Sequence, residues 1–338
     1  MRSGTQLRPT KAQFLFDSKK IDVSIRNRNL FPERITMQPF YFRADDRLPD
    51  TQYKDSLKRI LIEGEQMRNP FQTKGRRALL TLNPMVFLIA NGIPILTERK
   101  VSFWKKPIGE LLAFIHGVRD ARELADKWGV NWWRDQWATP EKCADFGLEP
   151  YDMGPGSYGA ALCYTLPNGK IFRQYEHLIA EIKENPGVIT HKVTTWIPHY
   201  CLNHSGNKRK VVVAPCHGDV EVTIIGDQLT LRMDQRSADF PIGVPSNMIQ
   251  YAVLTIMVAH VTGYVPHRYI HATHNAQIYD DQLDATKELI SRESFSFPSI
   301  NLTDEGMKVT NLFDFRPDHF ELRDYVSGPS MKDIPVTT

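Results

Sequence analysis

The sequence has little cysteine: Cys143, Cys163, Cys201 and Cys216 are the four in 338 residues. No two of them form a Cys-x-x-Cys pair, and this spacing argues against both a structural zinc site and a disulfide framework. We therefore expect no bound metal, a cytoplasmic setting in which thiols stay reduced, and at least one thiol that is free to react.

Strong net charge and long apolar runs are also lacking. The formal net charge of +3 is too small for a protein that coats nucleic acid. No apolar run approaches the roughly 20 residues of a membrane-spanning helix, and the N-terminal residues MRSGTQLRPTK lack the apolar core of a signal peptide. With 41% hydrophobic and 24% charged residues, the composition is ordinary for a soluble globular protein. The sequence therefore predicts a large buried core and no binding to membranes or nucleic acid.

The clearest local pattern lies between residues 211 and 282. Apolar and polar residues alternate from Val220 to Ile224 and again from Leu229 to Met233. A period of two is typical of a strand with one buried face. Gly226 and Asp227, between the two runs, supply turn chemistry, so the sequence predicts a β-hairpin.

An apolar segment from Ser246 to His260 follows, and Gly263 can close it. Because it is apolar on nearly every side, we expect a helix inside the core, preceded by a loop over Gln235 to Asp239 and followed by a strand. Polar residues gather at these joints, where a small anionic ligand is expected to bind. They are Cys216, His217, Gln235 to Asp239, Asn247, Asn275, Gln277 and Tyr279.

The same joints carry a resemblance to a known family. A single Pro-Cys-His motif would be weak evidence, but here several motifs occur in one order and at matching distances. The chain resembles thymidylate synthase over residues 53 to 336, most closely after residue 210. The motifs are Ala-Pro-Cys-His at 214–217, Gln-Arg-Ser-Ala-Asp at 235–239, Gly-Val-Pro-Ser-Asn at 243–247 and the segment from Tyr269 to Tyr279.

The resemblance implies an α/β fold of the thymidylate synthase type, with a large mixed sheet packed by helices and a sheet-to-sheet homodimer. The catalytic domain would span residues 51–338, after a polar and weakly periodic N-terminal extension over residues 1–50. The resemblance also implies 5,10-methylenetetrahydrofolate as the cosubstrate and dUMP or a related pyrimidine nucleotide as the substrate.

The motif after residue 210 implies a nucleophile and its partners. Cys216 matches the family's nucleophile, whose thiolate adds to carbon 6 of the pyrimidine. Arg236 would lower the pKa of that thiol and bind the nucleotide phosphate together with Gln235 and Ser237. Asp239 matches a catalytic residue that also holds the folate pterin.

Two further catalytic residues come from earlier in the chain. Glu110 lies beside the apolar face of a predicted helix from Pro107 to Gly117, where partial burial would raise the pKa of its carboxyl. The resemblance implies that Glu110 relays protons to the pyrimidine ring. It also implies that Tyr158, in a glycine-rich stretch, assists proton removal at carbon 5.

The base and sugar contacts are less complete. Asn247 favours uracil, because a side-chain amide can donate to O4 and accept from N3–H; an Asn that only caps the following helix is the alternative. Tyr279 matches the residue that binds the sugar 3′-hydroxyl. The family usually has a His beside this Tyr, and here Gln277 takes that place. The choice between deoxyribose and ribose as the sugar therefore stays open.

Two sets of phosphate ligands depart from the family pattern. Arg76 is our candidate for the arginine of the family's mobile loop, with Lys74 and Arg77 as alternatives. His191 and Lys192 stand near the position of two adjacent arginines that, in the family, reach the phosphate in the partner subunit.

The wall around the reacting carbon also departs from the pattern. Trp133 is the candidate for packing over the folate, and before Trp137 either Arg134 replaces the family's tryptophan or one residue is inserted. Val213 stands where the synthases usually have Leu. Both changes would admit water, so we predict a dUMP hydroxymethylase giving 5-hydroxymethyl-dUMP. The alternatives are thymidylate synthase, a dCMP or CMP hydroxymethylase, and a catalytically weak nucleotide- or RNA-binding relative.

Overall fold

The computed structural model describes residues 38–68, 74–331 and 334–336, which lie in one compact unit. Most of the extension predicted over residues 1–50 lies outside the described residues. Its last part packs on the rest of the unit. The Gln38 amide donates to the Leu302 carbonyl at 2.6 Å, and the Tyr41 hydroxyl donates to the Ile300 carbonyl at 2.7 Å. The domain boundary at residue 50 stays a prediction.

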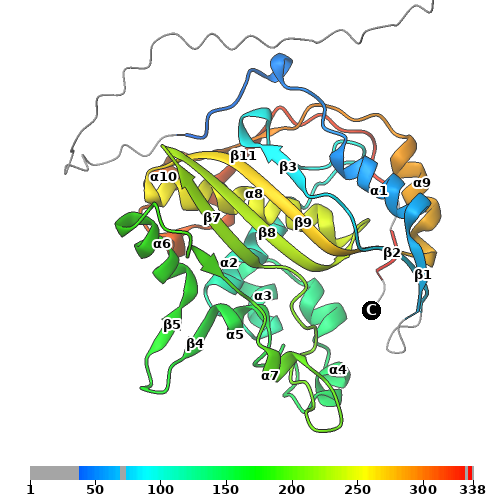
Figure 1. Ribbon diagram of the computed structural model, residues 1–338, viewed down its shortest axis with the longest axis vertical. Coiled ribbons are helices and arrows are strands. Elements are labelled where there is room, and N and C mark those ends of the chain that lie inside the picture. Colours follow the sequence, from blue (N-terminus) through cyan, green and yellow to red (C-terminus); the bar gives the residue numbers. More distant parts are fainter. Residues whose placement is uncertain (1–37, 69–73, 332–333, 337–338) are drawn as a thin grey trace, which may run out of the picture. The chain divides into compact units, whose positions relative to one another are not determined.

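Helices surround a central sheet (Figure 1). They are α1 (Gln52–Glu63), α2 (Lys105–Ile115), α3 (Ala121–Trp128), α4 (Pro140–Asp145), α5 (Tyr158–Leu162), α6 (Gln174–Glu184), α7 (Pro198–Cys201), α8 (Gly243–Thr262), α9 (Leu283–Ser291) and α10 (Asp304–Met307). Short 3-10 turns are η1 (Ala44–Asp46), η2 (Ile89–Asn91), η4 (Asp280–Gln282), η5 (Leu312–Asp314) and η6 (Pro317–His319), whereas η3 (Trp133–Trp137) is a π-helix.

The strands form one large mixed sheet and two small ones. They are β1 (Glu65–Met67), β2 (Arg76–Leu79), β3 (Met85–Leu88), β4 (Cys163–Thr165), β5 (Ile171–Arg173), β6 (Lys192–Val193), β7 (Asp219–Ile225), β8 (Gln228–Asp239), β9 (Val265–Tyr279), β10 (Ser299–Leu302) and β11 (Phe320–Arg323). The large sheet has the order β1-β2-β9-β8-β7-β6, with β3 also pairing with β9; β4 pairs with β5 and β10 with β11.

The centre of the sheet follows the predicted pattern. β7 and β8 form the expected antiparallel hairpin around Gly226 and Asp227, and β8 and β9 run parallel. Parallel neighbours need a long crossover, which α8 provides. The predicted mixed α/β architecture, a large sheet packed by helices, is therefore confirmed; dimer formation stays a prediction.

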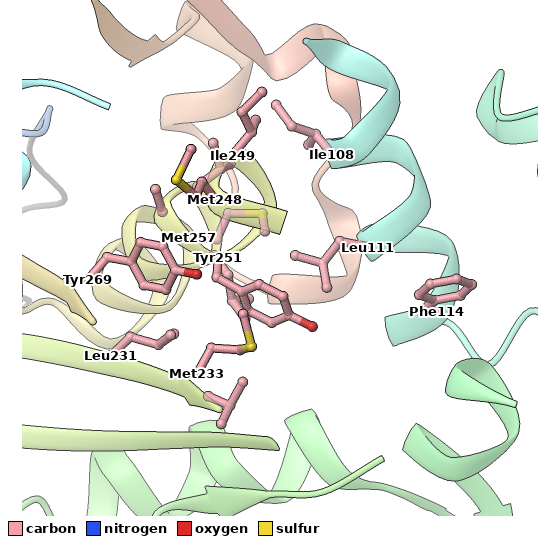
Figure 2. Close-up of a cluster of buried hydrophobic side chains, with 14 of the residues drawn as sticks. Ile108, Leu111, Phe114, Leu231, Met233, Met248, Ile249, Tyr251, Met257 and Tyr269 are labelled. Carbon is pink, nitrogen blue, oxygen red and sulfur yellow. The ribbon is translucent and has the colours of Figure 1, made fainter. Parts of the chain in front are cut away.

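α8 is the core helix. Every residue from Asn247 to Thr262 is buried, and Gly263 ends the helix with φ of 73°. Figure 2 shows its side chains packed between the sheet and Ile108 and Leu111 of α2. By length and composition α8 could cross a membrane, contrary to our expectation for the sequence. However, 94% of its apolar window is buried inside the protein, as in a core helix.

Some predicted boundaries were wrong. The segment Gln235 to Asp239 is the end of β8 rather than a loop, because it pairs with β9 from Gln235 opposite Thr273 to Asp239 opposite Gln277. α2 begins two residues before the predicted Pro107, and α8 begins at Gly243 instead of Ser246. The longer β8 carries polar side chains directly under the start of α8.

Candidate active site

Cys216 lies on the segment that leads into β7, against the end of β8. Its carbonyl accepts the backbone N–H of Arg236 at 2.7 Å, which fixes the two residues side by side. The guanidinium Nη2 of Arg236 is 3.7 Å from the Cys216 Sγ, and the backbone N–H of Cys216 donates to the Tyr158 hydroxyl at 2.7 Å. The structure therefore brings the predicted nucleophile, cation and tyrosine together.

Several contacts hold Arg236 at this position. It donates to the carbonyls of Pro215 at 3.3 Å and Ala214 at 3.4 Å, and it lies 4.9 Å from the ring centre of Trp196. Its charge lowers the pKa of the Cys216 thiol, but burial raises that pKa more. The net effect in the free protein favours the thiol form, whose Sγ lies 3.5 Å from the Ala214 carbonyl and can donate to it.

Glu110 is buried on α2 and accepts three N–H groups. Trp132 Nε1 is 2.6 Å and Trp133 Nε1 is 2.5 Å from Oε1, and the side-chain nitrogen of Gln250 is 2.6 Å from Oε2. Burial raises the pKa of Glu110, and the three donors oppose that rise. A carboxyl with a raised pKa is suited to relaying protons near neutral pH.

The π-helix explains the irregular tryptophan motif. A π-turn holds one more residue than an α-turn, so the structure favours the inserted residue over the replacement. Trp133 turns inward, with its ring centre 5.8 Å from that of Phe114 and 6.0 Å from that of Tyr158. Arg134 turns to Asp135 at 2.8 Å and Asp126 at 3.8 Å. Trp133 therefore faces Tyr158 and the inside of the site, whereas Arg134 forms ion pairs at the surface.

Asn247 lies one turn inside α8 and does not cap the helix. Its Oδ1 accepts from Gln235 Nε2 at 3.1 Å, and its Nδ2 donates to Gln250 Oε1 at 2.9 Å. These contacts keep the amide in the site, between β8 and Glu110, and rule out the capping alternative. One amide hydrogen and one oxygen lone pair remain for a ligand.

The ends of β8, β9 and β2 bring the other predicted ligands to one end of the sheet. Gln277 Nε2 donates to Ser237 Oγ at 2.7 Å, and Arg76 stands opposite Tyr279 in the β2–β9 pair. Lys74 is exposed, and residues 69–73 of the basic stretch lie outside the described residues.

Several buried polar atoms have no partner in the part of the chain that the structure describes. Such atoms are uncommon in folded proteins and fit a ligand that supplies donors, as the amide and amine groups of a pterin and a nucleotide do. Four of them come from residues at or beside the predicted site: Asp239 Oδ1, Gln277 Oε1, Asn275 Oδ1 and Ser157 Oγ.

Comparison with known proteins identifies the family. The family model described as thymidylate synthase matches residues 51–336. The chain belongs to the thymidylate synthase family. A curated relative, "Thymidylate synthase 1/2" of Encephalitozoon cuniculi (strain GB-M1), is 30% identical over 297 residues, 85% of this chain and 97% of that protein. The family transfers a one-carbon unit from 5,10-methylenetetrahydrofolate to carbon 5 of a pyrimidine nucleotide of the dUMP type.

Gln282 connects the C-terminal segment to Asp239, the residue that the family resemblance assigns to the folate pterin. The side-chain nitrogen of Gln282 donates to Asp239 Oδ2 at 3.2 Å and to the Pro335 carbonyl at 2.9 Å. Burial raises the pKa of Asp239 to about 7. A protonated Asp239 would be a donor as well as an acceptor, which suits a pterin ring carrying both kinds of group.

We expect Asp239→Asn to stabilise the protein in alkaline but not in acidic buffer. The carboxyl has an ordinary pKa of 3.8 when unfolded and about 7 when folded, so folding is weakened as pH rises through this interval. Each pKa unit is about 1.4 kcal/mol, which sets an upper limit of about 4 kcal/mol above pH 7. Thermal unfolding at pH 4 to 8 measures the difference, with exposed Asp284→Asn as the control. A gain of equal size at pH 4 and pH 8 would contradict the raised pKa.

One predicted substitute for the family's cross-subunit arginines is inaccessible. His191 is 1% exposed inside its own subunit, so it cannot reach a ligand in a partner. Lys192 is exposed but forms an ion pair with Glu221 at 2.8 Å. His191 therefore does not replace an arginine of that pair, whereas a role of Lys192 stays a prediction.

Sequence reasoning missed several polar residues behind the site. Gln250, Gln282, His271 and Tyr269 all hydrogen-bond to predicted site residues or to one another. One signal was available: Gln250 stands three residues after Asn247 in an otherwise apolar helix, and this spacing puts both on one face.

Proposed function

We propose that this protein methylates dUMP at carbon 5, giving dTMP and dihydrofolate. The observation that carries the proposal is the inward Trp133, whose ring stacks edge-on against Tyr158 beside Cys216. Apolar rings at this position exclude water from the reacting carbon, and hydride then has no competitor there. The relative named above is itself a thymidylate synthase.

Cys216 would add through its sulfur to carbon 6, which makes carbon 5 nucleophilic. Arg236, 3.7 Å from that sulfur, would stabilise the thiolate once the thiol proton has passed to bulk water at this half-exposed position. The folate supplies the one-carbon unit and, for a methyl product, the hydride. Tyr158 lies beside the sulfur, where it would help to remove the carbon 5 proton, and the carbon–sulfur bond then breaks to release Cys216.

Glu110 and Asn247 would hold the other edge of the base. The raised pKa of Glu110 suits a group that gives and takes a proton at O4 during addition and elimination. Asn247 presents one free amide hydrogen and one free lone pair, which supports uracil as the base. A catalytically weak binding protein would not need Cys216, Arg236, Tyr158 and Glu110 in one site.

Hydroxymethylation is the second candidate, and Val213 favours it. Val213 is half-buried and packs against the core, and because it is smaller than the usual Leu we expect more space there for a water molecule. The altered tryptophan motif at Arg134 was the other reason to predict a hydroxymethylase. This reason is weaker than the sequence suggested, because Arg134 is paired with Asp135 and Asp126.

The product of the wild-type reaction tests the proposal. With dUMP and 5,10-methylenetetrahydrofolate in ¹⁸O-labelled water, we expect unlabelled dTMP and one dihydrofolate for each product, detected by mass spectrometry and by absorbance of the folate. Val213→Leu is the matched variant and should leave the product unchanged. An ¹⁸O-labelled 5-hydroxymethyl product that disappears in Val213→Leu would favour the hydroxymethylase instead.

A further inference from the structure

Gln250 connects two groups of the site that have no direct contact. It is fully buried on α8, three residues after Asn247, and α2 packs beside this part of the helix. Its amide nitrogen donates to Glu110 Oε2 at 2.6 Å, and its amide oxygen accepts from Asn247 Nδ2 at 2.9 Å. An apolar side chain would fill the same space, so these two hydrogen bonds are what the amide adds.

The ionised form of Glu110 fixes which way the Gln250 amide faces. Trp132 and Trp133 can only donate, so both occupy Oε1 as donors. When Glu110 is ionised, its Oε2 can only accept, so that form requires the nitrogen of Gln250 and not its oxygen, which is the arrangement in the structure. The oxygen of Gln250 must then face Asn247, and the Asn247 atom that meets it must be the nitrogen.

The other side of Asn247 agrees with this orientation. Gln235 Nε2 donates to Asn247 Oδ1 at 3.1 Å and to the Ser237 carbonyl at 3.0 Å. Gln235 Oε1 lies 2.8 Å from His271 Nε2, which must therefore carry the hydrogen. His271 Nδ1 then accepts from the Tyr269 hydroxyl at 2.9 Å.

The result is a directed chain in which every donor points toward Glu110. Its members, in order, are Tyr269, His271, Gln235, Asn247, Gln250 and Glu110. Turning only the Asn247 amide would set its nitrogen against that of Gln235 and its oxygen against that of Gln250. Two buried hydrogen bonds would be lost at once, so the orientation is strongly preferred.

The orientation of Asn247 decides which base edge it complements. Uracil needs a donor opposite O4 and an acceptor opposite N3–H, whereas cytosine presents a donor at position 4 and an acceptor at N3. We propose that Gln250 is a positioning residue that makes the site select uracil over cytosine, by holding the Asn247 amide in one orientation against Glu110. This inference rests on the proposed use of dUMP.

Equilibrium binding of dUMP and dCMP to the full chain tests the inference without relying on turnover. Calorimetry gives the ratio of the two dissociation constants for wild type, Gln250→Met, Glu110→Gln and the double variant. Because one buried hydrogen bond changes an equilibrium by roughly tenfold, Gln250→Met should lower the preference for dUMP by about that factor. Thr255→Val is the control: Thr255 is buried on α8, and among the described residues its hydroxyl bonds the Tyr251 carbonyl alone, so the ratio should not change.

Glu110→Gln should lower the preference at least as much. The two tryptophan donors hold the oxygen of the introduced amide, so its nitrogen faces Gln250 and opposes the direction of the chain. In the double variant no amide at position 250 can pass the reversed orientation on to Asn247. The ratio of the two dissociation constants should therefore equal that of Gln250→Met.

Each outcome decides the inference. A ratio that Gln250→Met leaves unchanged, with both nucleotides weakened equally, means a purely structural role and overturns it. If Gln250→Met does not fold, an unchanged ratio in Glu110→Gln overturns it instead. Effects that multiply in the double variant also overturn it, because the two residues then act independently. If the wild-type protein does not prefer dUMP over dCMP, the proposed substrate is wrong. If the wild type prefers dUMP and the variants show the same preference, only the proposed role of Gln250 is wrong.

Discussion

Replacing Cys216 with serine should abolish turnover, lowering kcat by at least about 10⁴-fold, while dUMP still binds. A hydroxyl is a far weaker nucleophile than a thiol, and Arg236 at 3.7 Å cannot lower its pKa enough to ionise it near neutral pH. The backbone contacts of residue 216, to the Tyr158 hydroxyl and the Arg236 N–H, do not involve the sulfur and should persist. Release of tritium from 5-tritiated dUMP measures the reaction, and calorimetry measures binding.

Cys163→Ser is the matched control, because Cys163 is also half-buried but lies outside the site on β4. It should retain wild-type turnover. Tritium release near the wild-type rate in Cys216→Ser would show that another group attacks carbon 6. Loss of dUMP binding in the same variant would show that the sulfur has a structural role that the backbone contacts do not replace.

The parts of the fold that sequence patterns predicted are those governed by local periodicity. The β7–β8 hairpin follows from alternation around Gly226 and Asp227, and α8 follows from an apolar run closed by Gly263. The chemistry of the nucleophile also depends on a short segment, so Cys216 and its motif were recognisable. Their roles as site residues stay predictions until variants are measured.

What sequence reasoning missed depends on partners far apart in the chain. Gln235 to Asp239 looked like a polar loop, but pairing with β9 makes it a strand. Arg134 looked like part of the folate wall until the π-helix turned it to the surface. The role of Gln250 depends on its hydrogen bond to Glu110, 140 positions earlier, and no local sequence pattern predicts that contact.

The two halves of the site differ in how they are held. Glu110 and Asn247 are fixed by a buried network whose members satisfy one another, and such networks specify a single arrangement. Cys216 and Arg236 are held mainly by backbone atoms, at a half-exposed edge beside Trp196. A phosphate can therefore reach Arg236 from solvent, whereas the base must enter the interior. Replacing Arg236 should consequently affect both phosphate binding and the reactivity of the thiol.

We expect Arg236→Met to lower kcat/KM for dUMP by about 10³-fold, because one side chain serves two roles. Without the guanidinium the phosphate loses a charged fork, so dUMP should lose most of its advantage over deoxyuridine. The pKa of the Cys216 thiol, already raised by burial, should rise further, since Arg236 is the cation that lowers it. The rate of Cys216 alkylation by iodoacetamide, followed by peptide mass spectrometry from pH 6 to 10, should move to higher pH.

Two variants separate the roles of Arg236. Arg236→Lys keeps the charge but not the planar fork, so alkylation should shift less than in Arg236→Met while phosphate binding remains weakened. Arg232→Met, on the same strand and paired with Asp234 at 2.7 Å, is the control and should match wild type in both assays. If Arg236→Met keeps the preference for dUMP over deoxyuridine, Arg236 is not the phosphate ligand. If its alkylation profile does not move, burial alone sets the pKa of Cys216 and the guanidinium has no part in activating the thiol.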